Sequence, residues 1–302
     1  MDFFKIIDQL SEVDADVLGR FDSRRAVFSS LGTAAKRSAL AATPLFLGAL
    51  FQKAYAGTTS TPVEVLQYAL ALELFEQDFY RKVQASAPYL AASAADKGAI
   101  DQIKKHEDAH ATLLGNTIRG LGGTPVTGVT FKAATFATLA TFNTGPAAST
   151  ILGIAQILED TGVRAYKGRA GELLGTDLLT VALQIHSVEA RHASKIRTMR
   201  GQRPWVNPGD DLAGHPVYGN GVTPNGANPA RFGIPLPTYD AAKPSPTENN
   251  VLQGATATQP AVNITSALGT PYSANDAAAS FDEYLQPAEV LDDARAGGLI
   301  GA

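Results

Sequence analysis

Four long segments with apolar residues at helical spacing dominate what this chain can fold into. The first begins at Thr61, a good capping residue, has Pro62 at its first helical position, and stops before Pro88. The other three are expected over residues 94–121, 146–174 and 176–200. A linker of residues 124–145 is long enough to cross the length of a bundle and could hold a short helix. Two helical hairpins joined by one long crossover predict an all-α four-helix bundle.

Two of these segments carry a glutamate and a histidine three residues apart. The pairs are Glu107 with His110, in "KKHEDAHATLL", and Glu189 with His192, in "IHSVEARHASKIR". A spacing of three places both side chains on one helix face, about one turn apart. Either pair alone is more simply explained as part of a solvated helix face.

The first and third segments each place a glutamate in the middle of an apolar stripe. Glu73 and Glu159 both follow apolar residues that lie one and two turns earlier on the same face. A tyrosine comes seven residues after each of them, at Tyr80 and Tyr166. A carboxylate in an apolar stripe is costly unless it is paired or bound to a cation. The chain therefore consists of two similar halves, each with a Glu and Tyr helix and a Glu-x-x-His helix.

Four glutamates and two histidines converging in a bundle core predict a site for two divalent metal ions. The six expected ligands are Glu73, Glu107, His110, Glu159, Glu189 and His192. Four carboxylates neutralise two divalent ions, and carboxylate with imidazole suits iron or manganese. The chain has no cysteine, which excludes metal sites built on thiolates. Open positions could take O₂ or peroxide, and Tyr80 and Tyr166 could hydrogen-bond to ligands on neighbouring helices.

With these motifs the chain resembles the ferritin-like superfamily, and within it the exported ferritin-like proteins related to desiccation-associated proteins. The stretch "ALELFEQDFY", residues 71–80, is similar to the first-helix motif of that group. The resemblance covers residues 61–200 and implies a ferritin-like bundle in which Glu107 and Glu189 bridge the two metal ions. Haem in bacterioferritin-like dimers needs a methionine on the first hairpin. The methionines here are Met1 and Met199, so we expect no haem.

Three functions are compatible with this set of residues. The first is a di-metal enzyme that oxidises Fe²⁺ with O₂ or peroxide, or consumes peroxide, in stress protection. The second is iron binding or storage, and the third is a non-catalytic structural or stress-protective role. Assembly size would separate a storage cage from a small homo-oligomer. The net charge of −4 argues against a nucleic-acid partner, because such proteins normally present a basic face.

Three further residues near the expected ligands have open roles. Glu76 lies one turn past Glu73 and is either an additional ligand, a carboxylate on an access route or an exposed residue. His106 and His186 each precede a ligand of their own helix, and either could support a metal ligand by contacting it. We favour a surface or core-edge position for both.

The first 56 residues resemble a twin-arginine export signal. Arg24 and Arg25 precede a weakly apolar run at residues 38–51, and small residues follow at Ala54 and Ala56. This interpretation implies handling by the export machinery and a periplasmic or cell-envelope location. The alternative is an amphipathic N-terminal helix that stays attached.

The composition changes at Pro204, because twelve of the seventeen prolines lie from that residue onward. Such a segment cannot be a long helix. We expect it to wrap the bundle rather than to form a disordered tail, with one or two short helices within residues 280–298. The expected apolar anchors are Trp205, Val206, Tyr218, Phe232, Ile234 and Leu236. The predicted organisation is a signal segment (residues 1–56), a bundle (57–203) and an extension (204–302).

Overall fold

The computed structural model describes most of the chain after the first 59 residues. The described residues are 60–207, 209–218, 231–234, 236, 237, 239, 251–253, 262–269, 271–281 and 284–301. The predicted export signal, residues 1–56, lies outside them. Within the described part of the chain, no helix combines the length and the apolar character needed to cross a membrane.

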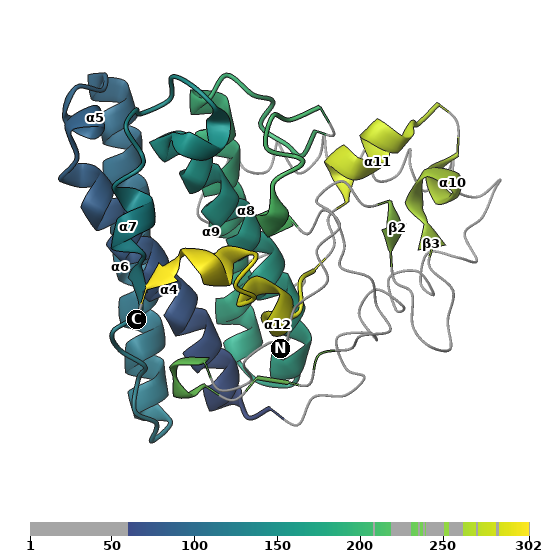
Figure 1. Ribbon diagram of the computed structural model, residues 1–302. Helices are drawn as coiled ribbons and strands as arrows, with labels where there is room; N and C mark the ends of the chain where they lie inside the picture. The colour runs from purple at the N-terminus through teal and green to yellow at the C-terminus, as the bar shows by residue number, and fades with distance from the viewer. Residues whose placement is uncertain are drawn as a thin grey trace, which may run out of the picture. The chain divides into compact units, whose positions relative to one another are not determined.

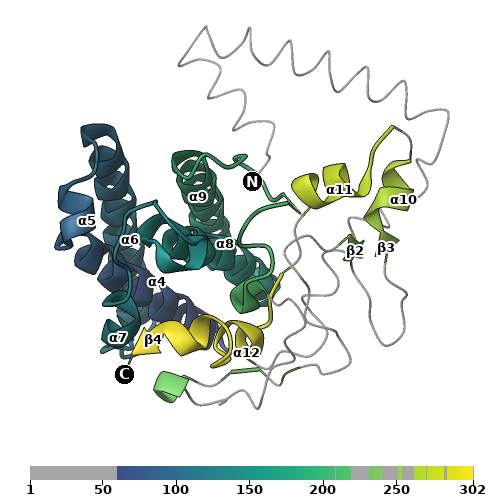
Figure 2. The ribbon, with the colours of Figure 1, turned by 45° about the horizontal axis from the view of Figure 1, so that its top comes forward.

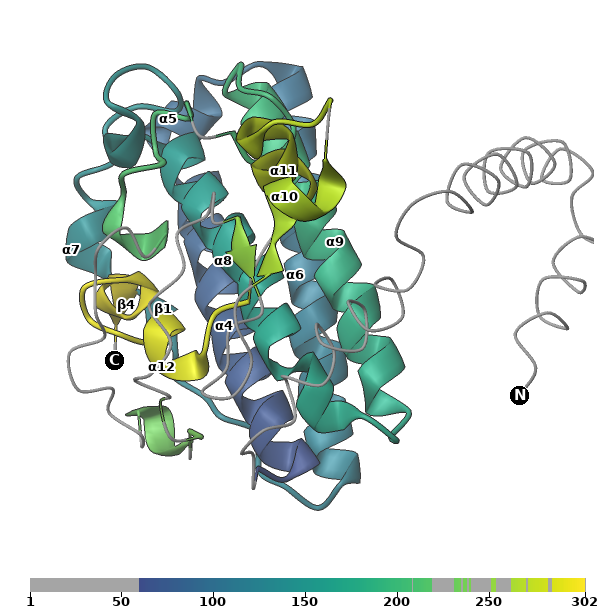
Figure 3. The ribbon, with the colours of Figure 1, turned by 90° about the vertical axis from the view of Figure 1, so that its right-hand side faces the viewer.

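Four long helices run side by side and form the core of the described structure (Figures 1 and 3). They are α4 (Pro62–Gln84), α6 (Ala94–Gly120), α8 (Ile151–Ala170) and α9 (Leu178–Met199). Helix α4 packs mainly against α6, and α8 mainly against α9, so each half of the chain forms a hairpin. Contacts of α4 with α8 and of α6 with α9 join the two hairpins. This arrangement confirms the predicted all-α four-helix bundle.

The helices begin where side chains cap their free backbone amides. Thr61 accepts a hydrogen bond from the amide of Glu64, whose carboxylate accepts one from the amide of Thr61 in return. Ser93 caps α6 in the same way through its hydroxyl. These caps explain why the first two boundaries were predictable to within a residue.

The third helix is shorter than the predicted span of residues 146–174. Thr150 has an extended backbone and caps α8 at the amide of Gly153, so the helix can begin only at Ile151. The residues before it form a separate 3₁₀ turn, η3 (Ala147–Ser149), and the residues after it form another, η4 (Gly171–Leu173). The fourth helix likewise starts at Leu178, two residues later than predicted.

The connections within the two hairpins are short, whereas the crossover from α6 to α8 is long. Helix α5 (Ala87–Leu90) lies within the first hairpin. The crossover from α6 to α8 contains strand β1 (Thr130–Phe131) and helix α7 (Ala133–Phe136). Strand β1 pairs antiparallel with β4 (Ile300–Gly301), so the last strand of the chain lies beside the crossover (Figure 2).

The described parts of the extension contain only short elements. They are η5 (Pro216–Tyr218), η6 (Arg231–Gly233), β2 (Leu252–Gln253), β3 (Val262–Asn263), α10 (Ile264–Leu268), α11 (Ala274–Ser280), α12 (Pro287–Val290) and η7 (Ala296–Leu299). Strands β2 and β3 pair antiparallel. The expected short helices within residues 280–298 correspond to α12 and the start of η7.

The extension contributes apolar side chains to the same core as the bundle. Val217, Tyr218, Ile234 and Leu285 are buried together with residues of α4 and α8. This packing is what a wrapped extension requires. Trp205, one of the expected anchors, is 49% exposed, so that prediction was wrong. Trp205 precedes Asp210, the first buried residue among the described residues of the extension.

Candidate metal centre

All six predicted ligands converge in the middle of the bundle. Helix α4 supplies Glu73, α6 supplies Glu107 and His110, α8 supplies Glu159, and α9 supplies Glu189 and His192. All four carboxylates are fully buried, and both histidines are buried. Helical spacing thus brings the ligands of all four helices to the same height in the bundle.

The ligand atoms form two overlapping groups, and within each group they lie within 4.8 Å of one another. The groups are Glu73, Glu107, His110 and Glu189, and Glu107, Glu159, Glu189 and His192. Glu107 and Glu189 belong to both. These are the two carboxylates that the sequence resemblance implies as bridges between metal ions.

Both histidines turn the same ring nitrogen toward the carboxylates. Nδ1 of His110 is 3.2 Å from Glu73 Oε2 and 3.3 Å from Glu107 Oε2. Nδ1 of His192 is 2.8 Å from Glu107 Oε1 and 3.1 Å from Glu159 Oε2. Each Nδ1 is therefore the atom that would face a cation.

Several carboxylate oxygens at the centre are buried without a hydrogen-bond donor. Within the described structure these are Oε1 of Glu107 and both oxygens of Glu189. Glu107 Oε1 is 2.8 Å from His192 Nδ1 and Glu189 Oε1 is 3.3 Å from His110 Nδ1, but neither pair of atoms meets in hydrogen-bond geometry. A buried carboxylate without a donor is strongly unfavourable, so these oxygens fit a cation that would neutralise them.

A glycine on α8 makes room for one of these carboxylates. A Cβ atom at Gly162 would come within 2.9 Å of Glu189 Oε2, closer than such contacts normally allow. The absence of a side chain at this position therefore lets Glu189 reach the middle of the site. The residues present thus fit a pair of divalent cations in charge, donor type and space.

Two tyrosines tie the helices together across the site. The hydroxyl of Tyr80 on α4 donates to Glu159 on α8, and the hydroxyl of Tyr166 on α8 donates to Glu73 on α4. The two contacts are reciprocal, as the repeated Glu and Tyr spacing led us to expect. Each bond leaves the second oxygen of its carboxylate directed at a histidine.

Comparison with known protein families supports this description of the bundle. Residues 61–202 match the family model of the ferritin-like domain. The matched span contains all six predicted ligands and both tyrosines. No curated protein sequence matches the chain.

The buried charges of the candidate metal centre perturb one another strongly. Burial raises the pKa of Glu73 to about 8, and burial together with neighbouring carboxylates raises the pKa values of Glu159 and Glu189. Burial acts against charge on the histidines, but their contacts with the carboxylates raise the pKa of His110 to about 12 and that of His192 to about 11. Without metal, the site therefore holds protons that a cation would have to displace.

Thermal stability of the metal-free protein is expected to fall as the pH rises from about 5 to about 9. A group whose pKa is raised by folding stabilises the protein below its unfolded-state pKa, and this stabilisation is lost as the pH rises toward the folded value. The groups at the site with raised pKa values all act in this direction across this pH range. They are Glu73, Glu159, Glu189, His110 and His192. The melting temperature should drop by on the order of 10 °C.

Differential scanning calorimetry of chelator-treated protein would measure this trend. With Mn²⁺ present the trend should weaken or reverse, because metal competes with protons and binds better at higher pH. The Glu73→Gln variant should show a smaller pH slope than the wild type. A melting temperature of the metal-free protein that stays flat or rises with pH would contradict the charge arrangement.

The three residues with open roles are also placed by the structure. Glu76 is buried, and burial together with the nearby Glu189 raises its pKa, so the alternative of an exposed Glu76 was wrong. His106 is half-buried at the edge of the core, and its ring also contacts His192. His186 contacts the backbone oxygen of Val163 on α8, outside both ligand groups. Sequence spacing could not distinguish these outcomes, because all three lie near the edge of an apolar stripe.

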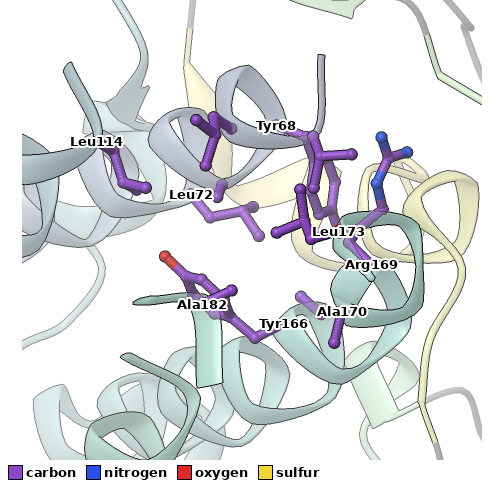
Figure 4. Close-up of a pocket in the computed structure, with 12 residues that line it drawn as sticks. Tyr68, Leu72, Leu114, Tyr166, Arg169, Ala170, Leu173 and Ala182 are labelled. Carbon is purple, nitrogen blue, oxygen red and sulfur yellow. The ribbon is translucent and has the colours of Figure 1, made fainter. Parts of the chain in front are cut away.

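A small cavity lies next to Tyr166, and none of the six predicted ligands lines it. Its volume is about 20 Å³, and most of the residues that line it are apolar. Figure 4 shows Tyr166, Leu114 and Ala182 around it. A larger groove lies between α4, α6 and residues 125–130, also outside the ligand set.

Proposed function

We propose that the ferritin-like domain is a di-metal carboxylate centre that binds two iron or manganese ions. The observation that carries this proposal is the pair of overlapping ligand groups that share Glu107 and Glu189. Two cations sharing two carboxylates would neutralise the four negative charges of the site. Hard oxygen donors with one imidazole for each cation favour iron or manganese over metals that prefer thiolate.

We further propose that the centre oxidises Fe²⁺ with O₂ or peroxide, or consumes peroxide, as part of stress protection. When bound, the two metal ions would supply the redox chemistry at coordination positions left open by the protein. The protein holds Glu159 and Glu73 in place through the hydroxyls of Tyr80 and Tyr166. It also excludes bulk water, because all four carboxylates are fully buried.

Metal analysis of protein purified without chelators tests the proposal directly. We expect about two iron or manganese ions per chain. Chelated protein reloaded with Fe²⁺ should then oxidise it faster than Fe²⁺ alone does under air or with added peroxide. Folded protein that takes up neither Fe²⁺ nor Mn²⁺ would favour the structural alternative. Metal uptake without oxidation would favour binding or storage, and sedimentation analysis would then separate a cage from a small homo-oligomer.

We also propose that the protein works outside the cytoplasm, in the periplasm or cell envelope. The support is the Arg24–Arg25 pair and the apolar run that follows it. Fractionation of the native cells, done on the same preparation as the metal analysis, addresses this point. Recovery of the full-length chain from the cytoplasm alone would contradict export.

A further inference from the structure

The two histidine-bearing helices carry a repeated nine-residue pattern. "QIKKHEDAH" (residues 102–110) on α6 and "QIHSVEARH" (residues 184–192) on α9 share Gln, Ile, Glu and His at equivalent positions. The residue just before the glutamate differs, and it is His106 on α6 but Val188 on α9. The two halves therefore supply matching ligands but different neighbours.

His106 uses both of its ring nitrogens within the protein. Its Nδ1 lies 2.9 Å from Nε2 of His192, and the two rings are nearly parallel, with centroids 5.1 Å apart. Its Nε2 lies 2.6 Å from the side-chain amide of Gln102. Contacts thus run from the exposed Gln102 through His106 to Nε2 of His192, the ring nitrogen that does not face the carboxylates.

His110 has no matching support among the residues that the structure describes. Its Nδ1 faces Glu73, Glu107 and Glu189, and none of these described residues forms a hydrogen bond with its Nε2. Its side chain is 10% exposed, whereas that of His192 is 5% exposed. The two ligand groups are therefore equal in donor atoms but unequal in how firmly their histidines are held.

We infer that His106 is a positioning residue that makes the two metal positions unequal, so that the position at His192 fills first. This inference rests on the proposed function. A cation on Nδ1 of His192 requires the ring proton to be on Nε2. Nδ1 of His106, 2.9 Å away, accepts from that Nε2–H when His106 carries its own proton on Nε2, and the side-chain amide of Gln102 then turns its oxygen toward His106. Such a partner fixes both the tautomer and the ring orientation of a metal-binding histidine. Its loss typically costs 10–100-fold in metal affinity.

Titration of the chelated full-length protein with Co²⁺, followed by visible absorption and calorimetry, tests the inference. The wild type should bind two ions in separate steps, whose dissociation constants differ by about 10–100-fold. In His106→Val, which copies the residue of the other half, the tighter step should weaken by that factor and merge with the second. His106→Gln keeps an acceptor oxygen and should retain part of the separation. His186→Val, which removes the other extra histidine, should leave both steps unchanged.

Two results would overturn the inference while leaving the proposed function intact. One is a wild type that binds two Co²⁺ ions in equal steps. The other is a folded His106→Val protein that keeps the separation or weakens both steps alike. A wild type that binds no Co²⁺, Fe²⁺ or Mn²⁺ would instead defeat the proposed function, and the inference with it.

Discussion

The double variant Glu107→Gln/Glu189→Gln is expected to bind essentially no iron or manganese, against about two ions per chain for the wild type. These two carboxylates belong to both ligand groups, so their loss removes donors from both positions at once. The remaining carboxylates could balance only half of the charge of two divalent ions. Oxidation of Fe²⁺ by the variant should fall to the uncatalysed rate.

The same variant should stay folded without metal, because both glutamates are fully buried and an amide of the same size keeps their packing. Glutamine removes the charge of Glu189, whose pKa burial raises. Glu107 acts in the other direction, because despite its burial the contacts with His110 and His192 lower its pKa to about 2, so its charge stabilises the fold. The melting temperature of the metal-free variant, measured by circular dichroism, should therefore lie close to that of the metal-free wild type. Loss of metal then cannot be attributed to unfolding.

A matched control lies beside one of these ligands. Asp108→Asn also removes a carboxylate from α6, but Asp108 is paired with Lys104 and Gln77 outside the ligand groups. This variant should keep both metal ions. Retention of two ions by the double variant, or equal loss in Asp108→Asn, would rule out Glu107 and Glu189 as the shared ligands.

The parts of the fold that the sequence predicted correctly are those governed by local signals. Thr61 with Pro62 and Ser93 are capping residues whose effect extends over a single turn. Glu73 and Glu159 stand out because a carboxylate in an apolar stripe needs a partner wherever the helix packs. Helical periodicity then brings both to the level of the Glu-x-x-His pairs.

The parts that the sequence could not predict depend on contacts between distant segments. His106 lies at the edge of its helix face, and only the packing of α6 against α9 decides that it meets His192. The ring that it contacts is 86 residues away in the chain. The course of the extension is undetermined for the same reason, because prolines and glycines exclude a helix without saying which surface the segment covers.

Asp160 shows how a residue beside a ligand can have a separate structural role. It follows Glu159 in sequence but turns away from the metal centre toward Arg197 of α9, with its Oδ2 2.5 Å from Nη2. Arg197 also contacts Asp210 of the extension, Nη1 to Oδ2 at 2.6 Å. Tyr218 donates to Asp160 at 2.7 Å, and Gln156 donates to Asp210 at 2.9 Å. This buried network fastens the extension to the bundle.

The Arg197→Met variant is expected to lose about 3–5 kcal/mol of unfolding free energy. Methionine fills similar space but leaves Asp160 buried without its cation and Asp210 with only Arg200, whose Nη1 is 3.8 Å from Oδ1. Urea unfolding followed by circular dichroism would measure the loss, and limited proteolysis should show faster cleavage after residue 203.

Arg191→Met on the exposed face of the same helix makes the same chemical change and should alter stability by less than about 0.5 kcal/mol. Metal content should stay at two ions per chain in both variants wherever they are folded, because none of these residues belongs to a ligand group. An Arg197→Met protein as stable as Arg191→Met would show that the extension is held by apolar packing alone.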